Sequence, residues 1–184
     1  MSDKLENITT HILVDTRQQK NKHGFKHAFF EKHNIEIYRS KLPVGDYMIP
    51  GGKSAVATKA SILELANNLR QDHVRFRNEC ELSQKLGIQL YILIENPDGV
   101  KSLQDLSNWV EPINSFYIRK TKNKNAKRIY GKQLARAAST MSKKYGVLFG
   151  FCTALEAGRR VIEILENHEK KRMEAIISNA SQNK

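Results

Sequence analysis

Asp46 and Lys59 are the residues of this sequence whose types and spacing point most directly to chemistry. Asp46 follows a glycine at the start of one extended segment and Lys59 ends the next, with ten residues between Asp46 and position 57. Side chains alternate across a strand, so positions 57 and 59 face the same side. Enzymes that hydrolyse phosphodiesters with Mg²⁺ use two such strands to present two acids and a lysine. The spacing therefore favours a metal-dependent nuclease site.

The chemistry of such a site explains its residue types. Two carboxylates can share a hard, oxygen-loving cation, either Mg²⁺ or Mn²⁺. The ion activates water and stabilises charge on the phosphate, while the lysine orients the water. Asp15, which ends a short apolar segment, could supply a further oxygen ligand. We therefore expect Asp46, Asp15 and the residue at position 57 to hold the ion, and Lys59 to act on the water.

Position 57 departs from this chemistry because it is an alanine. Loss of one carboxylate should weaken divalent-ion binding severely, since ligand charge sets the affinity for hard cations. The chain as written is therefore expected to be inactive. Two interpretations stay open. Either Ala57 replaces a natural Asp or Glu so as to trap an uncleaved complex, or Ala57 is natural and the chain is a non-catalytic DNA-binding subunit or an accessory protein that uses the same fold.

Five ordered segments of the sequence carry a family resemblance. They resemble the nuclease domain of the XPF, Mus and Hef structure-specific endonucleases, in which VDxRE, GDY, ERK, RxxxQ-like helix residues and a hydrophobic strand ending in IE follow one another. The resemblance covers roughly residues 12–165, and the stand-alone form looks like short versions carried by bacteriophages. The segments are VDTRQQ (14–19), LPVGDYMI (42–49), VATKAS (56–61), RFRNE (75–79) and LIE (93–95).

This resemblance implies roles for individual residues. Asp46 matches the first metal-binding carboxylate, Lys59 the catalytic lysine and Asp15 the strand-end aspartate. Arg17 matches the arginine of VDxRE, and Arg75 the helix arginine that approaches the scissile phosphate. The resemblance implies a restriction-endonuclease-like fold of the PD-(D/E)XK superfamily. It also implies an endonuclease that cuts branched or junction DNA, including Holliday junctions, in phage recombination, replication or packaging.

Other positions depart from the family pattern less seriously. Thr58 replaces the arginine of ERK, and Gln18 the glutamate of VDxRE. Glu95 matches the acidic strand end at the rim of the site. Glu64 stands one position beyond the place of the family's acid that follows the lysine, but Ser61 and Glu64 also form a capping-box pattern. We expect Glu64 to cap a helix rather than to bind metal.

The chain is strongly basic, with 31 lysines and arginines against 19 aspartates and glutamates and a net charge of +12. This charge favours a polyanionic partner through phosphate contacts. The densest basic run, residues 119–128, is flanked by Phe116, Tyr117 and Tyr130, which could stack on unpaired bases; a solvated loop is the alternative. We expect DNA contacts, without sequence specificity, from Arg17, Arg75, Arg119, Lys120, Lys122, Lys124, Lys127 and Arg128.

Apolar segments of strand length alternate with amphipathic segments of helix length along the chain. This pattern is typical of an α/β fold with a central mixed sheet flanked by helices. Strands are expected at residues 11–15, 35–39, 54–59, 88–95 and 147–152, and residues 42–49 are expected to form a turn that leads into a further strand. Helices are expected at residues 23–33, 61–86, 132–145, and directly after Ser102 and Thr153.

We divide the chain into a polar N-terminal tail (1–10), a nuclease domain (11–167) and a C-terminal helical extension or tail (168–184). Met173, Ile176 and Ile177 give the extension an apolar stripe at helical spacing. This stripe could pair with a second copy in a homodimer, with a frayed tail as the alternative. The resemblance to phage proteins also suggests a phage or host DNA-processing protein as a partner.

Several classes of protein and site are disfavoured. The longest apolar runs are strand-length, far short of the roughly 20 residues of a membrane span, and the polar N-terminus is no signal peptide. We therefore expect a protein of the bacterial host cytoplasm, with no membrane partner. Cys80 and Cys152 are too few for a disulfide framework and are expected to be buried thiols. His23 and His27 lack a zinc-enzyme pattern, so DNA contact or simple solvation is expected.

Overall fold

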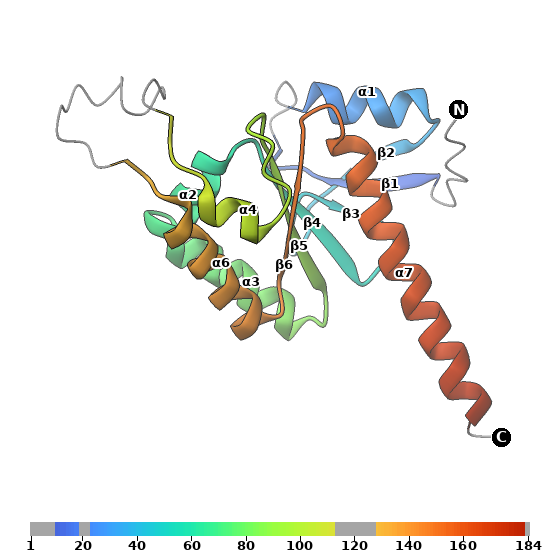
Figure 1. The fold of residues 1–184 in the computed structure, drawn as a ribbon. Helices are drawn as coiled ribbons and strands as arrows, with labels where there is room; N and C mark the ends of the chain where they lie inside the picture. Colours follow the sequence, from blue (N-terminus) through green and yellow to red (C-terminus); the bar gives the residue numbers. More distant parts are fainter. Residues whose placement is uncertain (1–9, 19–22, 113–127, 183–184) are drawn as a thin grey trace.

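The structure, a computed structural model, describes residues 10–18, 23–112 and 128–182. Its centre is a six-stranded mixed sheet in the order β2-β1-β3-β4-β5-β6 (Figure 1). The predicted α/β fold, with a mixed sheet flanked by helices, is confirmed. The strands are β1 (His11–Asp15), β2 (Glu36–Ser40), β3 (Tyr47–Met48), β4 (Ser54–Lys59), β5 (Gln89–Glu95) and β6 (Leu148–Cys152).

The direction of the strands determines where their polar ends meet. β3 runs antiparallel to both of its neighbours, β1 and β4, whereas the β1–β2, β4–β5 and β5–β6 pairs are parallel. β1, β4 and β5 therefore all end at the same edge of the sheet, and β3 begins there. Asp15, Lys59 and Glu95 are the last residues of these three strands. The topology gathers three charged residues at one edge.

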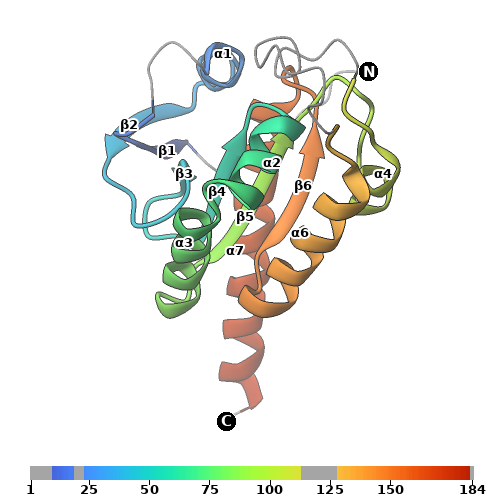
Figure 2. The ribbon, with the colours of Figure 1, turned by 90° about the vertical axis from the view of Figure 1, so that its left-hand side faces the viewer.

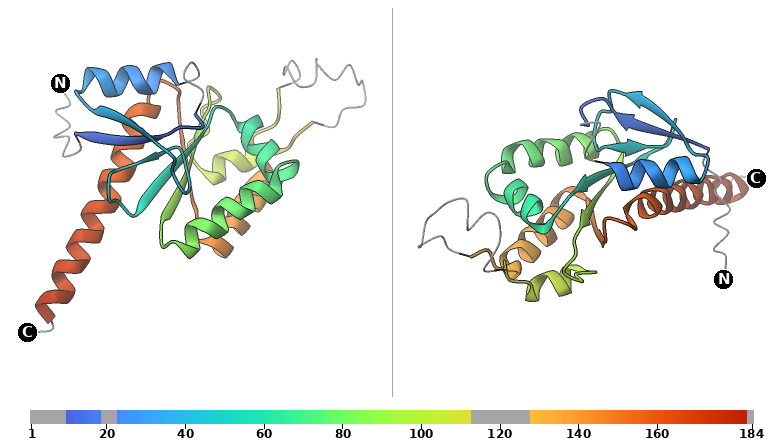
Figure 3. Two further views of the ribbon diagram at one scale, coloured as in Figure 1. Left: turned by 180° about the vertical axis from the view of Figure 1, so that it is seen from behind. Right: turned by 90° about the horizontal axis from the view of Figure 1, so that it is seen from above.

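Helices cover both faces of the sheet. α1 and α7 pack on one face, and α2, α3 and α6 on the other, with α4 beside α6 (Figures 2 and 3). Along β4, Val56 belongs to the core under α1 and α7, and Ala57 to the core under α2, α3 and α6. The helices are α1 (Gly24–Lys32), α2 (Ile62–Arg70), α3 (His73–Lys85), α4 (Leu103–Asn108), α6 (Gly131–Tyr145) and α7 (Ala157–Gln182).

The segment predicted as one long helix, residues 61–86, forms two helices, so that prediction was wrong. Between α2 and α3 the backbone N–H of Asp72 donates to the carbonyl oxygen of Asn67, five residues back, at 3.0 Å. The interruption lets Leu65 of α2 and Phe76 of α3 enter the same core. A straight helix would continue past that core, and no glycine or proline in the segment signals the break.

α7 is a single helix of 26 residues whose C-terminal turns project beyond the sheet (Figure 1). Val161 and Leu165 are fully buried on the sheet, whereas Met173, Ile176 and Ile177 are at least half exposed. The homodimer proposed for this stripe stays a prediction. No helix within the described ranges is long and apolar enough to cross a membrane.

Candidate active site

A cavity of about 700 Å³ lies at the sheet edge where β1, β4 and β5 end. All five predicted catalytic positions line it: Asp15, Asp46, Ala57, Lys59 and Arg75. The strands bring the first four together, and α3 supplies Arg75 from the wall. Residues spread over 61 positions of the sequence, from 15 to 75, therefore share one cavity because of the strand directions.

Asp46 is held at the entry to β3 by its backbone and its side chain. Its N–H donates to the carbonyl oxygen of Val56 at 2.8 Å, and its carboxylate accepts from the N–H and hydroxyl of Thr58 at 2.7 and 3.0 Å. Gly45, just before it, has φ +72°, and a Cβ there would lie 3.0 Å from the Cβ of Ala55. The glycine allows the left-handed backbone and the close strand approach that place Asp46.

Lys59 projects from the same side of β4 as Ala57, two residues earlier. Its side chain is largely buried, with the residue 9% exposed, and its Nζ lies 5.8 Å from the centroid of the Phe76 ring. No hydrogen bond or ion pair joins this ammonium to another residue in the described parts of the chain. Lysines are almost never this buried unless paired. The cavity therefore presents a cation that lacks an anion.

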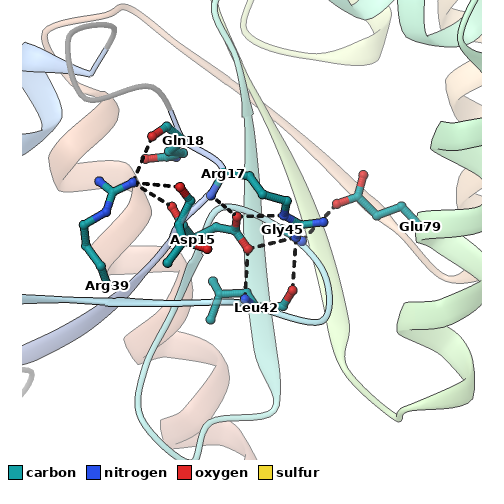
Figure 4. Close-up of polar contacts among 8 residues, drawn as sticks. Asp15, Arg17, Gln18, Arg39, Leu42, Gly45 and Glu79 are labelled. Carbon is teal, nitrogen blue, oxygen red and sulfur yellow. Dashed lines mark hydrogen bonds and ion pairs between the residues drawn. The ribbon is translucent and has the colours of Figure 1, made fainter.

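Asp15 is buried and fully engaged by its neighbours (Figure 4). Its carboxylate accepts from Nε and the second guanidinium nitrogen of Arg17, both at 2.8 Å, and from the backbone N–H of Leu42 at 2.9 Å. Although burial opposes ionisation, these hydrogen bonds hold the pKa of the Asp15 carboxyl below its ordinary value. In this arrangement Asp15 orients Arg17 and the loop before β3; its role as a metal ligand stays a prediction.

Arg39 and Gln18 complete the polar cluster around the end of β1. The guanidinium of Arg39 donates to the carbonyl oxygens of Asp15, Thr16 and Gln18 at 3.3, 3.1 and 2.9 Å (Figure 4). Arg39 was not among the predicted site residues. Its contribution follows from the parallel pairing that sets it opposite Val14, and that pairing is not visible from residue types alone.

Glu79 connects α3 to the glycine turn of the site. Its carboxylate accepts from the backbone N–H of Gly45 at 2.9 Å (Figure 4). Arg75 stands one turn earlier on the same face of α3, and its side chain is 81% exposed, with a guanidinium nitrogen 3.8 Å from Asp72. Glu79 lies four residues after Arg75 on the same helix, and this spacing could have predicted that Glu79 faces the site. Arg75 remains free to reach a ligand at the mouth of the cavity.

Glu95 and Lys26, which both line the cavity, form a buried ion pair. Lys26 is 3% exposed and Glu95 is 8% exposed. Glu95 was expected at the rim of the site, and it does line the cavity. Lys26 was not singled out, because its role depends on how α1 lies across the end of β5. The pair neutralises an acid that would otherwise face the cavity without a counter-ion.

Ser61 caps the start of α2, and Glu64 contacts the residue before this cap. The N–H of Glu64 donates to Ser61 Oγ at 3.1 Å, and the Glu64 carboxylate accepts from the N–H of Ala60 at 2.7 Å. The capping prediction is confirmed. Glu64 also lines the cavity, directly after the strand that carries Lys59.

A divalent ion does not fit the residues present. Across residues 10–18, 23–112 and 128–182, no three His, Cys, Asp or Glu residues gather into a group that could hold a metal ion. Ala57 contributes only a methyl group at the central position. Asp46, Asp15 and Glu95 all accept hydrogen bonds or ion pairs from the chain itself. Without an acid at position 57, the cavity is suited to an anion beside Lys59 rather than to a cation.

The predicted DNA-contacting run is described only in part. Arg119, Lys120, Lys122, Lys124 and Lys127 lie outside the described residues. Arg128 is described, and its Nε donates to the carbonyl oxygen of Glu111 at 2.9 Å. Cys80 and Cys152 are buried, as predicted, and burial raises the pKa of each thiol to about 12.

Comparison with known proteins bears on the fold. No protein-family model matches the sequence, and no curated protein sequence matches it significantly. Among solved structures, XPF from Aeropyrum pernix matches with a TM-score of 0.58 and 14% sequence identity, over 91% of this chain and 69% of that one. This chain has an XPF-like fold. The structure of XPF from Aeropyrum pernix in complex with DNA matches with a TM-score of 0.56 and 16% identity, over 89% of this chain and 66% of that one.

Proposed function

We propose that this chain binds DNA and seats a backbone phosphate in the cavity beside Lys59. The observation that carries the proposal is the buried ammonium of Lys59, which has no anionic partner among the described residues. Phosphate is the anion expected for a chain of net charge +12. The likeness of the fold to XPF, one structure of which is a complex with DNA, supports the proposal.

We propose further that the chain with an acid at position 57 is a structure-specific endonuclease that requires Mg²⁺ or Mn²⁺. Position 57 lines the same cavity as Asp46, Lys59 and Arg75, so a carboxylate there would complete the expected set. Branched or junction DNA is the proposed substrate, since contacts to phosphates position a duplex without reading its sequence. A role in phage recombination, replication or packaging, and a homodimer formed through α7, belong to the same proposal.

A non-catalytic DNA-binding subunit is the second candidate, and the packing at position 57 favours it. Ala57 is 2% exposed and belongs to the core under α2 and α3. The remaining carboxylates of the cavity are engaged by donors of the chain itself. The site is therefore consistent with a phosphate-binding surface that needs no ion.

Cleavage of labelled flap, fork and four-way-junction DNA with Mg²⁺ or Mn²⁺ separates the two candidates. The chain is compared with its Ala57→Asp and Ala57→Glu variants, and Ala57→Asn serves as a control of matched size without charge. The endonuclease proposal expects cuts from an acidic variant and none from the alanine or asparagine forms. If both acidic variants bind the DNA and leave it intact, the endonuclease proposal fails and binding alone remains.

A salt titration of DNA affinity tests the phosphate site itself. Lys59→Met should weaken binding and reduce the slope of log affinity against log salt by about one, because one phosphate contact is lost. Lys53→Met is the control, since Lys53 is exposed on the turn of the same hairpin and outside the cavity. Equal slopes for the two variants would contradict a phosphate at Lys59.

A further inference from the structure

A second hollow, here called the α6 groove, has a volume of about 600 Å³ and lies between α2 and α3 on one side and α6 on the other. This size is typical of sites for small ligands. Phe76 separates the groove from the candidate active site: it lines the groove, and its ring centroid lies 5.8 Å from Lys59 Nζ. The groove and the cavity share no lining residue, and the buried ring of Phe76 lies between Lys59 and the groove.

Asn68 is the feature of the groove that indicates a ligand. This residue of α2 lines the groove, is 5% exposed, and has an Oδ1 without a hydrogen-bond partner among the described residues. Buried side-chain oxygens are nearly always hydrogen-bonded in folded proteins. The Oδ1 atom is itself buried at the wall of the groove, so a bound molecule could supply its missing N–H donor only after the covering side chains move.

The charges around the groove are of one sign. Lys132 and Arg136, one turn apart on α6, line it, and none of the described residues that line it is acidic. The Lys132 and Arg136 side chains have no ion pair with a carboxylate in the described parts of the chain. The groove therefore attracts an anionic ligand.

The groove also has an apolar component. Leu69 of α2, Phe76 of α3 and Met141 of α6 line it beside the cationic groups. A ligand that matches all three features has a flat apolar ring, an N–H donor on that ring and an anionic group. A nucleotide with an unpaired base has this combination, because base faces pack on apolar side chains and base edges carry amino groups.

We propose that the α6 groove binds an unpaired nucleotide of the DNA whose phosphate lies beside Lys59. The base of this nucleotide lies against Leu69 and Met141 and donates an amino hydrogen to Asn68 Oδ1. The nucleotide's own phosphate, distinct from the one beside Lys59, contacts Lys132 and Arg136. This inference rests on the proposed DNA binding and adds to it a site for a single-stranded branch. It also gives a physical basis for preferring branched DNA to a continuous duplex, in which every base is paired.

An acidic peptide would match the positive charge of the groove but not its other features. The position of the groove, one aromatic ring from the proposed phosphate site, favours a ligand continuous with the DNA. The single unpaired acceptor of Asn68 is also better matched by one base amino group than by a peptide, whose successive backbone N–H groups would each need an acceptor. A nucleotide is therefore the occupant that the observations favour.

Fluorescence anisotropy with three labelled DNAs tests the proposal. They are a blunt duplex, the same duplex with a short adenine overhang, and the same duplex with an overhang of purine bases that lack the amino group. We expect the adenine overhang to raise affinity about tenfold over the blunt duplex. Asn68→Leu should remove the preference for adenine over amine-free purine, about fivefold. Arg136→Gln should reduce the gain from either overhang, and Lys143→Gln, an exposed change on the last turn of α6, should not.

The outcomes distinguish the groove from the proposed function. If the chain binds none of the DNAs, the proposal of DNA binding fails first. If it binds blunt and overhang DNA equally, or if Arg136→Gln keeps the full overhang gain, the groove proposal is overturned while DNA binding stands. A third outcome would also overturn the proposal: the overhang gives no gain in DNA affinity, and an acidic peptide binds the chain but not its Arg136→Gln variant. The groove would then be assigned to a protein partner.

Discussion

The rim and the centre of the candidate active site differ in how completely their charges are paired. At the rim each charged group has a partner in the chain. At the centre Ala57 offers no carboxylate, and Lys59 has neither a hydrogen bond nor an ion pair among the described residues. The difference shows that the charges of the rim are paired within the folded chain, whereas the ammonium at the centre is available to pair with a bound ligand. The rim comprises Asp15 with Arg17, Lys26 with Glu95, and Glu79 with the N–H of Gly45.

The largest effect on stability is expected from breaking the buried pair of the rim. Lys26→Met leaves the Glu95 charge buried without its partner, and should lower the free energy of unfolding by about 3–5 kcal/mol. Urea denaturation measures it, with Lys32→Met, an exposed change on the same helix, as the control. A loss equal to that of the control would mean that the pair does not hold the rim together.

The glycine that joins rim and centre should give the next largest effect. Gly45→Ala combines a positive φ with a Cβ contact of 3.0 Å, and a loss of about 1–3 kcal/mol is expected from the strained backbone alone. Gly51→Ala is a matched control, because Gly51 has the same φ of +72° with open space around it. The excess loss at Gly45, measured by thermal unfolding, reports the close approach of the strands. No excess would contradict that explanation.

Asp15→Asn should reduce stability by about 1–3 kcal/mol near neutral pH, because the Arg17 and Leu42 donors lose a charged acceptor. The change should also reduce the slope of the free energy of unfolding against pH on the acid side. The folded pKa of Asp15 lies below its unfolded value, so its contribution is present above about pH 4 and is lost as pH falls through the folded pKa. Urea denaturation from pH 6 to pH 3 checks the slope. Identical slopes for the two proteins would show that Asp15 is not coupled to folding.

The smallest loss of stability is expected at the centre. Lys59→Met should not lower the free energy of unfolding and should, if anything, raise it, because no ion pair among the described residues is lost and the desolvation cost of a largely buried ammonium is removed. The same variant should weaken DNA binding. A destabilisation as large as that of Asp15→Asn would mean that Lys59 supports the fold, and the contrast between rim and centre would fail.

The sequence was sufficient to predict the residues of the site that depend on local pattern. Alternation along β4 places positions 57 and 59 on one face, and the Ser61–Glu64 spacing identifies the start of α2. These features are decided by residues close in the chain. The mixed sheet followed equally from the alternation of apolar and amphipathic segments.

Features that depend on tertiary packing were beyond the sequence. The Lys26–Glu95 pair joins residues 69 positions apart, and it requires α1 to lie over the end of β5. The break between α2 and α3 lacks a glycine or proline and follows from the need of both helices to reach one core.

The position of α7 has a consequence for the synthesis of the chain. Val161, Ile162 and Leu165 complete the core that contains Val14 and Val56. The ribosome produces β1 to β6 before it produces this helix, so the part of the apolar face that α7 covers, next to α1, stays exposed until α7 emerges. Sheets with an exposed apolar face tend to associate with one another or with chaperones. Folding of this chain is therefore expected to wait for α7, and the site at the strand ends is expected to form only after this helix has emerged.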